Sequence, residues 1–369
     1  MLTSCLGHGG AERVTVNIAN YLNQRDWTVT ILPFRPEIDD YPVDAGVVVD
    51  RGMPQGKLPI LRGLQKQRHI MASIRRASPD VVVSLAAGLE HLALSRSVQR
   101  YRLVTSVVTD PAWMFEVNPV TRALYRLGLR LSSKIVFQSR GALSYFGEPI
   151  RRKGVIIDNP LVDGLSHNAT PFAERDREIV TFGRLIPVKR LDVLLRAFAI
   201  FHQEFPDYRL TVFGRGPEKD SLERLVDELG LSAHVAIEDF RTDIHDRIRD
   251  SAMYVSSSDI EGVSNSMLEA MALGLPSACT DAAPGGTREI IERFGTGVLA
   301  ETGDPQSLAG AMSTIARSPQ HADQMIERGR RLSEELANDV VCGKWTTVFE
   351  SVIPDAAHHR SGGAGVSER

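Results

Sequence analysis

The sequence predicts an α/β protein with two domains, each a parallel sheet covered by helices. Both halves of the chain alternate short β-branched and apolar runs with longer segments of helical spacing, which is typical of parallel sheets buried on both faces. The length of 369 residues suits two domains. Residues 159–175, rich in Asn, Pro, Asp, Gly, Ser and Thr, indicate a linker between the halves.

The first half predicts an N-terminal domain over residues 1–158. Residues 1–6 indicate a short first strand, because a glycine turn follows at once. Four further apolar runs predict buried strands at residues 27–33, 80–85, 102–108 and 134–138. Segments of helical spacing lie at residues 11–25, 60–77 and 119–132.

The second half predicts a C-terminal domain over residues 176–340. Its expected strands are residues 179–182, 209–213, 235–237, 253–256 and 277–279. Its expected helices are residues 191–205, 219–229, 244–250, 266–273 and 304–317. A final helical segment covers residues 341–354, and the small and polar tail, 355–369, is expected to be disordered.

Composition excludes several classes of protein. With 43% hydrophobic and 24% charged residues, the chain is unlike disordered, collagen-like or disulfide-scaffold proteins. Cys5, Cys279 and Cys342 are far apart, so we expect neither a disulfide framework nor a thiolate zinc site. The longest apolar stretch, residues 81–89, is too short to span a bilayer, and the N-terminus lacks a secretion-signal pattern. We therefore expect a cytoplasmic protein.

The net charge of −3 hides an asymmetry between the two halves. Residues 1–158 carry a charge of +8 and residues 159–369 a charge of −11. Such a basic half attracts anionic lipid headgroups, phosphorylated acceptors or nucleic acid, although a solvated helix face gives the same pattern. Arg122, Arg126 and Arg130 recur every four residues among apolar ones, which predicts a basic amphipathic helix that contacts an anionic membrane at its inner face.

A glycine turn opens the first helix. Residues 7–12 read GHGGAE, and Gly9 and Gly10 would let backbone N–H groups approach an anion at a helix N-terminus. The third glycine of a dinucleotide fingerprint is missing. Tight strand-to-helix turns also use glycine for purely steric reasons.

Two cations follow the first strand of the C-terminal domain. Gly183 and Arg184 directly follow that strand, and Lys189 precedes the next helix. Two cations beside exposed backbone suit a diphosphate, which Arg184 can bind through two hydrogen bonds. The alternative is a pair of solvated charges on a loop.

Two carboxylates with seven residues between them form the most specific pattern. Glu261 is expected in a loop and Glu269 in the first turns of a helix capped by Ser264 or Asn265. A carboxylate suits the vicinal hydroxyls of a sugar, and free amides at a helix start suit a phosphate. Alternatively, Glu261 is only a surface charge, and Glu269 only interacts with the helix dipole. Asp110 is a weaker candidate, because Asp before Pro also makes ordinary turns.

With these residues identified, the chain resembles the retaining glycosyltransferases of family 4, which have the two-domain GT-B fold with the two sheets facing a central cleft. The resemblance covers nearly the whole chain. Four segments carry it in the family's order: LGHGGAERVTVNIANYL, FGRLIPVKRLDVLLRAF, TVFGRGPEKDSLERLVDELGL and SSSDIEGVSNSMLEAMALGLPSACTDAAPGGTREII. The last segment is similar to the branch that builds bacterial polysaccharides and lipid-linked oligosaccharides.

The resemblance implies transfer of a sugar from a nucleotide-diphosphate donor, most commonly a UDP-sugar, to a glycan or polyprenyl-diphosphate-linked acceptor. It implies no metal or other cofactor, and it puts the acceptor on the N-terminal domain. Arg184 and Lys189 would hold the diphosphate and the leaving group. Glu269 would bind the ribose hydroxyls, and Glu261 would lie beside the donor sugar. Further donor contacts would come from Gly9, Gly10, Gly183, Gly262, Val263, Ser264 and Asn265.

Two positions depart from the family pattern. Many members carry a histidine near the donor sugar, in the place where we expect Asp110 here. The family often has a glycine beside the nucleobase where this chain reads IEDF, which puts Phe240 next to the base and leaves the base open. In this fold the segment 341–354 would cross back and pack on the N-terminal domain.

Other functions remain alternatives. A catalytically silent relative could bind nucleotide sugars, but the pairs Glu261–Glu269 and Arg184–Lys189 argue against a decayed site. A nucleotide-sugar 2-epimerase shares the fold, but its acid and base residues are not apparent. Nucleic-acid binding is disfavoured, because aromatic residues make up only 6% of the chain and the basic runs lack interleaved stacking residues.

Overall fold

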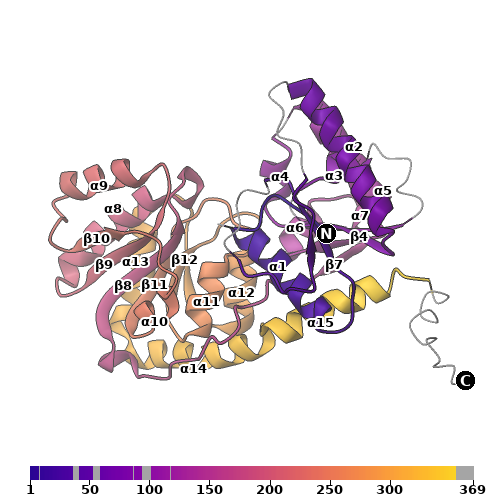
Figure 1. Cartoon of the computed structure of the whole chain (residues 1–369). Coiled ribbons are helices and arrows are strands. Elements are labelled where there is room, and N and C mark those ends of the chain that lie inside the picture. Colours follow the sequence, from indigo (N-terminus) through magenta and orange to yellow (C-terminus); the bar gives the residue numbers. More distant parts are fainter. Residues whose placement is uncertain are drawn as a thin grey trace, which may run out of the picture.

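The protein consists of two α/β lobes that lie side by side (Figure 1), as predicted. The computed structural model describes residues 1–7, 9–35, 41–52, 59–85, 87–93, 101–116 and 118–354. The N-terminal sheet has the strand order β3-β2-β1-β4-β5-β6-β7 and the C-terminal sheet the order β10-β9-β8-β11-β12-β13. Neighbouring strands pair in parallel. The tail 355–369 lies outside the described residues.

The N-terminal sheet contains the predicted strands and two short ones that the sequence did not reveal. Its strands are β1 (Leu2–Thr3), β2 (Thr30–Pro33), β3 (Val48–Val49), β4 (Val81–Ser84), β5 (Arg102–Val107), β6 (Lys134–Phe137) and β7 (Gly154–Ile156). Its helices are α1 (Gly10–Asn23), α2 (Pro59–Ala77), α3 (Leu89–Ala93), α4 (Pro111–Met114), α5 (Pro119–Leu131), α6 (Arg140–Ser144) and α7 (Glu148–Arg151). Elements of two to five residues show no periodicity, which explains why β3, β7, α3, α4, α6 and α7 were missed.

The C-terminal sheet is built in the same way. Its strands are β8 (Asp176–Arg184), β9 (Arg209–Arg215), β10 (Val235–Glu238), β11 (Ser251–Ser256), β12 (Ser277–Thr280) and β13 (Gly297–Ala300). Its helices are α8 (Leu191–Glu204), α9 (Lys219–Glu228), α10 (Ile244–Ile248), α11 (Asn265–Ala272), α12 (Gly286–Phe294), α13 (Pro305–Arg317) and α14 (Pro319–Glu335). The strand β13 and the helices α12 and α14 were not predicted.

Two apolar cores cover the C-terminal sheet, and one of them continues into the N-terminal domain. Side chains of α8, α9 and α13 fill one face. Side chains of α10, α11 and α12 fill the other face, and they join a cluster that also contains Val14 and Ile18 of α1. Burial of apolar surface therefore holds the two domains together as well as each sheet.

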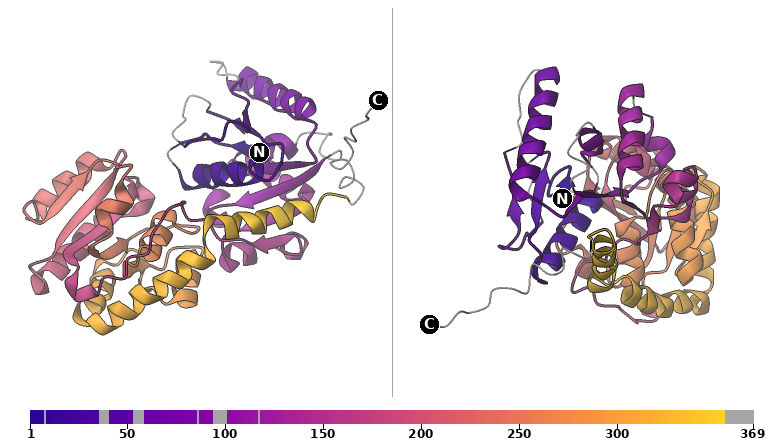
Figure 2. Two further views of the ribbon diagram at one scale, coloured as in Figure 1. Left: turned by 60° about the horizontal axis from the view of Figure 1, so that its bottom comes forward. Right: turned by 90° about the vertical axis from the view of Figure 1, so that its right-hand side faces the viewer.

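The last helix, α15 (Asn338–Glu350), lies on the N-terminal domain. It follows α14, which runs along the C-terminal domain, so the chain crosses between the domains a second time (Figure 2). The ring of Phe349 lies 6.3 Å from that of Trp27, which follows α1, and 5.7 Å from that of Trp345. The helix begins three residues before the predicted segment 341–354.

No helix among the described residues is both long enough and apolar enough to cross a bilayer.

The contact of α15 with the N-terminal domain predicts a stability effect. Phe349 is fully buried, so Phe349→Ala leaves a cavity and is expected to lower the free energy of unfolding by about 3–5 kcal/mol. Lys344→Ala, on an exposed position of the same helix, should change it by less than about 0.5 kcal/mol. Urea unfolding followed by circular dichroism measures both. Equal effects of the two substitutions would show that α15 is not anchored through this ring.

Candidate functional site

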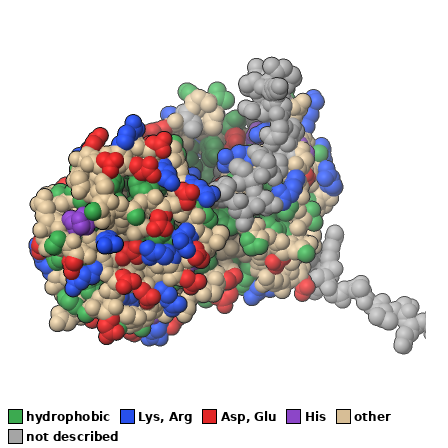
Figure 3. Space-filling view, turned by 60° about the vertical axis from the view of Figure 1, so that its left-hand side comes forward, with side chains coloured by type: hydrophobic (Ala, Val, Ile, Leu, Met, Phe, Trp, Pro, Cys, Tyr) green, Lys and Arg blue, Asp and Glu red, His purple; other side chains and the backbone are tan. Residues whose placement is uncertain are grey.

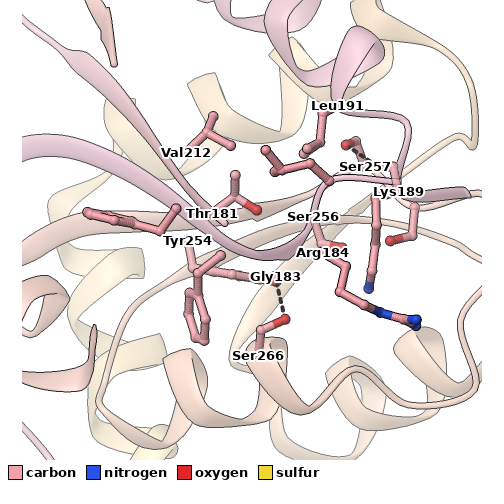
Figure 4. Close-up of a pocket in the computed structure, with 14 residues that line it drawn as sticks. Thr181, Gly183, Arg184, Lys189, Leu191, Val212, Tyr254, Ser256, Ser257 and Ser266 are labelled. Carbon is pink, nitrogen blue, oxygen red and sulfur yellow. Dashed lines mark hydrogen bonds between the residues drawn. The ribbon is translucent and has the colours of Figure 1, made fainter. Parts of the chain in front are cut away.

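A pocket lies at the carboxyl ends of β8 and β11, on the side of the C-terminal sheet that meets the N-terminal domain. Its lining includes Gly183 and Arg184 at the end of β8, Lys189 in the loop that follows, and Tyr254 and Ser256 on β11. Parallel strands collect their following loops at this edge, where α/β proteins bind ligands. Burial raises the pKa of Tyr254, so its phenol stays neutral and shares a hydrogen bond of 3.1 Å with Ser266 (Figure 4).

The two cations predicted for a diphosphate lie together in this pocket. The nitrogen-bearing ends of the Arg184 and Lys189 side chains lie near one another (Figure 4). The Lys189 ammonium forms an ion pair with the Glu261 carboxylate. Arg184 is exposed and has no acidic partner among the residues that the structure describes. One compensated and one uncompensated cation therefore face the same space, which favours an anionic ligand.

Arg190, which the sequence analysis did not single out, fixes the loop that carries Lys189. Arg190 has a left-handed backbone conformation, with φ 46°, directly after the turn Pro187–Lys189. Its guanidinium binds Asp192 at 3.0 Å and Asp259 at 2.8 Å, and these hydrogen bonds raise the pKa of Arg190. The hydroxyl of Ser257 donates to the Lys189 carbonyl at 2.8 Å. The loops after β8 and β11 are thus held as one unit.

The segment between the two glutamates forms the start of α11. Ser264 caps the helix, and its hydroxyl accepts from the amide of Met267. Within the described chain, the amides of Gly262, Val263 and Asn265 donate to no backbone carbonyl. The positive end of the helix dipole and these free amides could receive a phosphate. A phosphate at this place, expected from the sequence, stays a prediction.

Glycines allow the N-terminal domain to approach this helix closely. A Cβ atom at Gly262 would lie 2.5 Å from both the Val108 carbonyl oxygen and the Gln138 side-chain oxygen. A Cβ atom at Gly10 would lie 2.6 Å from the side-chain nitrogen of Asn265. The predicted glycine turn therefore lies opposite the start of α11. Gly9 lies beside the Glu12 carboxylate instead.

A chain of buried amides crosses the junction between the domains. Gln138, after β6, donates to Asn159 at 2.5 Å. Asn159 then donates to the side-chain oxygen of Asn265 at 2.7 Å and to the Val263 carbonyl at 3.1 Å. Asn159 was counted in the linker, and its place in this network was not predicted. The network ties the linker to the loop that precedes α11.

Glu269 is buried, with 2% of its surface exposed, and cations or donors from both domains surround it. His245 of α10 lies 2.7 Å from one carboxylate oxygen. Arg13 of α1, from the N-terminal domain, forms an ion pair with the other oxygen. Neither partner was predicted: a single histidine in a five-residue helix leaves no pattern, whereas Arg13 stands directly after the glycine turn and could have been suspected.

The helix that carries His245 is fastened to the sheet. Glu178 on β8 accepts two hydrogen bonds from Arg247 of α10, at 2.7 and 2.8 Å, and others from Thr211 and Ser251. Burial raises the pKa of Glu178, but these hydrogen bonds lower it by more, so the pKa of Glu178 lies below its ordinary value of 4.5. Glu178 therefore positions α10 beside Glu269.

Neither of the two positions that depart from the family pattern is among the residues that line the pocket. Asp110 accepts from the amide of Ala112 at 3.0 Å and caps α4, which is the ordinary turn role weighed for it above. Phe240 follows β10, is 59% exposed and is not among the residues that line the pocket. Contacts of either residue with sugar or base stay predictions.

The three arginines predicted for membrane contact line a surface groove on α5. Arg122, Arg126 and Arg130 share it with Pro119 and Leu127. Large apolar side chains on the same helix are exposed, at 69% for Val120 and 42% for Leu127. The outer face of the C-terminal domain instead mixes acidic and basic side chains (Figure 3).

No group of three or more His, Cys, Asp or Glu residues in the described ranges is arranged to hold a metal ion.

Two family models match consecutive parts of the chain. Residues 8–161 match the model described as Glycosyltransferase Family 4, and residues 164–332 match Glycosyl transferases group 1. The chain belongs to the family 4 glycosyltransferases. It is 23% identical to an uncharacterized glycosyltransferase of Haemophilus influenzae over 92% of this chain and 96% of that one. It is 26% identical to the N-acetyl-alpha-D-glucosaminyl L-malate synthase of Bacillus anthracis over 72% of each chain.

The GT-B fold of this glycosyltransferase is shared with solved structures. It superposes on HepE from Anabaena, solved in complex with UDP, with a TM-score of 0.76 and 20% identity over 95% of this chain and 98% of that chain. Two further relatives, 31% and 32% identical, match about half of this glycosyltransferase but only 20% and 42% of their own length.

The role of Glu178 predicts a pH-dependent stability. Because folding lowers the pKa of Glu178, the ionised carboxylate stabilises the folded state above pH 4.5. This stabilisation is lost as the pH falls below that value. Wild type should therefore melt at a higher temperature than Glu178→Gln at pH 7, and the difference in melting temperature should shrink as the pH falls below 4.5. Glu292→Gln, on an exposed carboxylate of α12, serves as the control. A difference that does not change with pH would contradict this account.

Proposed function

We propose that this glycosyltransferase moves a hexosyl unit from a UDP-sugar to a glycan or lipid-linked acceptor, with retention of configuration at the sugar. The observation that carries the proposal is the pairing of Arg184, which has no acidic partner in the described chain, with Lys189 beside the free amides of α11. This arrangement suits a diphosphate leaving group. The UDP complex of HepE from Anabaena supports uridine as the base.

Leaving-group stabilisation is the main task that we assign to the site. In the reaction the bond between the sugar carbon C1 and the β-phosphate oxygen breaks. The acceptor oxygen bonds to C1 on the same face of the ring, and its proton passes to the departing phosphate. Arg184 and Lys189 would neutralise the negative charge that develops on that phosphate. We propose that these two cations do the work of a metal ion, so activity should persist in EDTA.

The two glutamates would hold the two ends of the donor. Glu269 would accept hydrogen bonds from the ribose hydroxyls, as its burial at the start of α11 favours a fixed orientation. Glu261 would lie beside the sugar and keep Lys189 in place through their ion pair. The amides from Gly262 to Asn265 would contact sugar and phosphate.

We propose that the acceptor lies on the N-terminal domain at the cytoplasmic face of a membrane. The charge of +8 on residues 1–158 and the groove of Arg122, Arg126 and Arg130 support attraction to anionic headgroups. The exposed Val120 and Leu127 would add apolar contact with the acyl region.

Nucleotide binding is the first test. A thermal-shift titration with UDP, GDP, ADP and CDP should give selective stabilisation by UDP. Arg184→Ala and Glu269→Ala each remove hydrogen bonds that involve a charged group, and should weaken the affinity roughly 10- to 100-fold. Arg196→Ala, an exposed arginine on α8, should leave it unchanged.

A folded wild type that none of the four nucleotides stabilises would contradict the proposal. It would favour a silent relative, in which the donor site no longer works.

Membrane contact is tested by flotation with vesicles rich in phosphatidylglycerol. The protein should float at low salt and much less at 1 M salt, where the Debye length falls to about 3 Å. The double variant Arg126→Glu and Arg130→Glu should float less than wild type, while Arg196→Ala should behave like wild type. Failure of the wild type to float at low salt would refute this part of the proposal.

A further inference from the structure

The carboxylate assigned to the ribose is already occupied by a side chain of the other domain. One oxygen of Glu269 forms an ion pair with the guanidinium of Arg13, and the other lies 2.7 Å from His245. The Glu269 side chain is 3% exposed, so solvent or a ligand hardly reaches it in this arrangement. A ribose hydroxyl can reach the oxygen beside Arg13 only if that guanidinium moves.

Arg13 cannot withdraw with its helix while the domains stay closed. It lies in the first turn of α1, three residues after Gly10, which itself approaches Asn265 of α11. The same helix buries Ile18 and Leu22 in the core. The ion pair therefore breaks either by rotation of the Arg13 side chain or by separation of the domains.

The ion pair is incompletely satisfied. The Nε–H group of Arg13 is buried and has no hydrogen-bond acceptor in the described structure. A buried donor without a partner costs free energy, so this pair is weaker than a fully bonded arginine–carboxylate pair. Donors from a nucleotide can therefore compete with Arg13 for Glu269.

We propose that Arg13 gates the donor site: it occupies Glu269 in the nucleotide-free protein and is displaced by the ribose hydroxyls when the donor binds. The gate rests on the proposed function, because it uses the role of Glu269 in binding ribose. Arg13 acts here as a positioning residue that couples the N-terminal domain to occupancy of the donor site. Its removal should tighten nucleotide binding, whereas removal of a residue that contacts the donor weakens it.

Calorimetric titration of the full chain with UDP and with 2′,3′-dideoxy-UDP tests the gate. Arg13→Ala should bind UDP at least about fivefold more tightly than wild type, in the usual range of coupling between sites. Its affinity for 2′,3′-dideoxy-UDP should equal that of wild type, because this nucleotide has no hydroxyls that compete for Glu269. Arg13→Gln keeps a neutral hydrogen-bond donor and much of the side-chain stem, so its affinity for UDP should lie between those of wild type and Arg13→Ala.

Arg25→Ala is the matched control. Arg25 follows the same helix but contacts Tyr21 and lies away from Glu269, so this variant should bind UDP like wild type. The melting temperature is a second readout. Without nucleotide, Arg13→Ala should melt at a lower temperature than wild type, but UDP should raise its melting temperature by more than it raises that of wild type. A side chain with a merely structural role would lower the melting temperature without tightening UDP binding.

Unchanged or weaker UDP binding by folded Arg13→Ala and Arg13→Gln overturns the gate, even if wild type binds UDP. The gate is also overturned if Arg13→Ala gains as much affinity for 2′,3′-dideoxy-UDP as it gains for UDP. Absence of nucleotide binding by both wild type and the Arg13 variants would overturn the proposed function and the gate together, which separates the two failures.

Discussion

A carboxylate buried where two domains meet is the constraint on which the rest of the site depends. Glu269 is 2% exposed, and a buried charge is tolerated only when cations or hydrogen-bond donors compensate it. One partner, His245, comes from the domain that carries Glu269, and the other, Arg13, comes from the opposite domain. The electrostatics of one side chain thus links the arrangement of the domains to the site that we propose for the donor.

Close backbone contact makes this electrostatic link possible. Gly10 and Gly262 let the glycine turn of one domain and the start of α11 in the other approach to distances that a Cβ atom would prevent. Glu289 of α12 adds a further contact, because its carboxylate accepts from the amides of Arg140 and Gly141 at the start of α6. Apolar burial under α1 and α15 provides the adhesion, and these polar contacts define the orientation.

The sequence predicted most of the fold because long elements leave a periodic pattern. Helices such as α1, α8 and α13 were found with shifts of one or two residues at their ends. Of the candidate site, the sequence singled out Arg184, Lys189, Glu261 and Glu269, since each lies within a contiguous segment of the family pattern. The sequence did not reveal the contacts of Arg13, His245 and Arg190, because the residues in contact lie far apart in the chain. The separation is 256 positions for Arg13 and Glu269, 24 for His245 and Glu269, and 69 for Arg190 and Asp259. Such contacts depend on tertiary packing, which a single sequence does not encode in any local spacing.

The most direct test of the whole account is a crystal structure of the full chain with UDP. The account predicts the diphosphate within hydrogen-bond distance of Arg184 and Lys189, and a ribose hydroxyl bound to Glu269 in the place that Arg13 now occupies. UDP bound away from the carboxyl ends of β8 and β11, or a diphosphate that contacts neither cation, would contradict it.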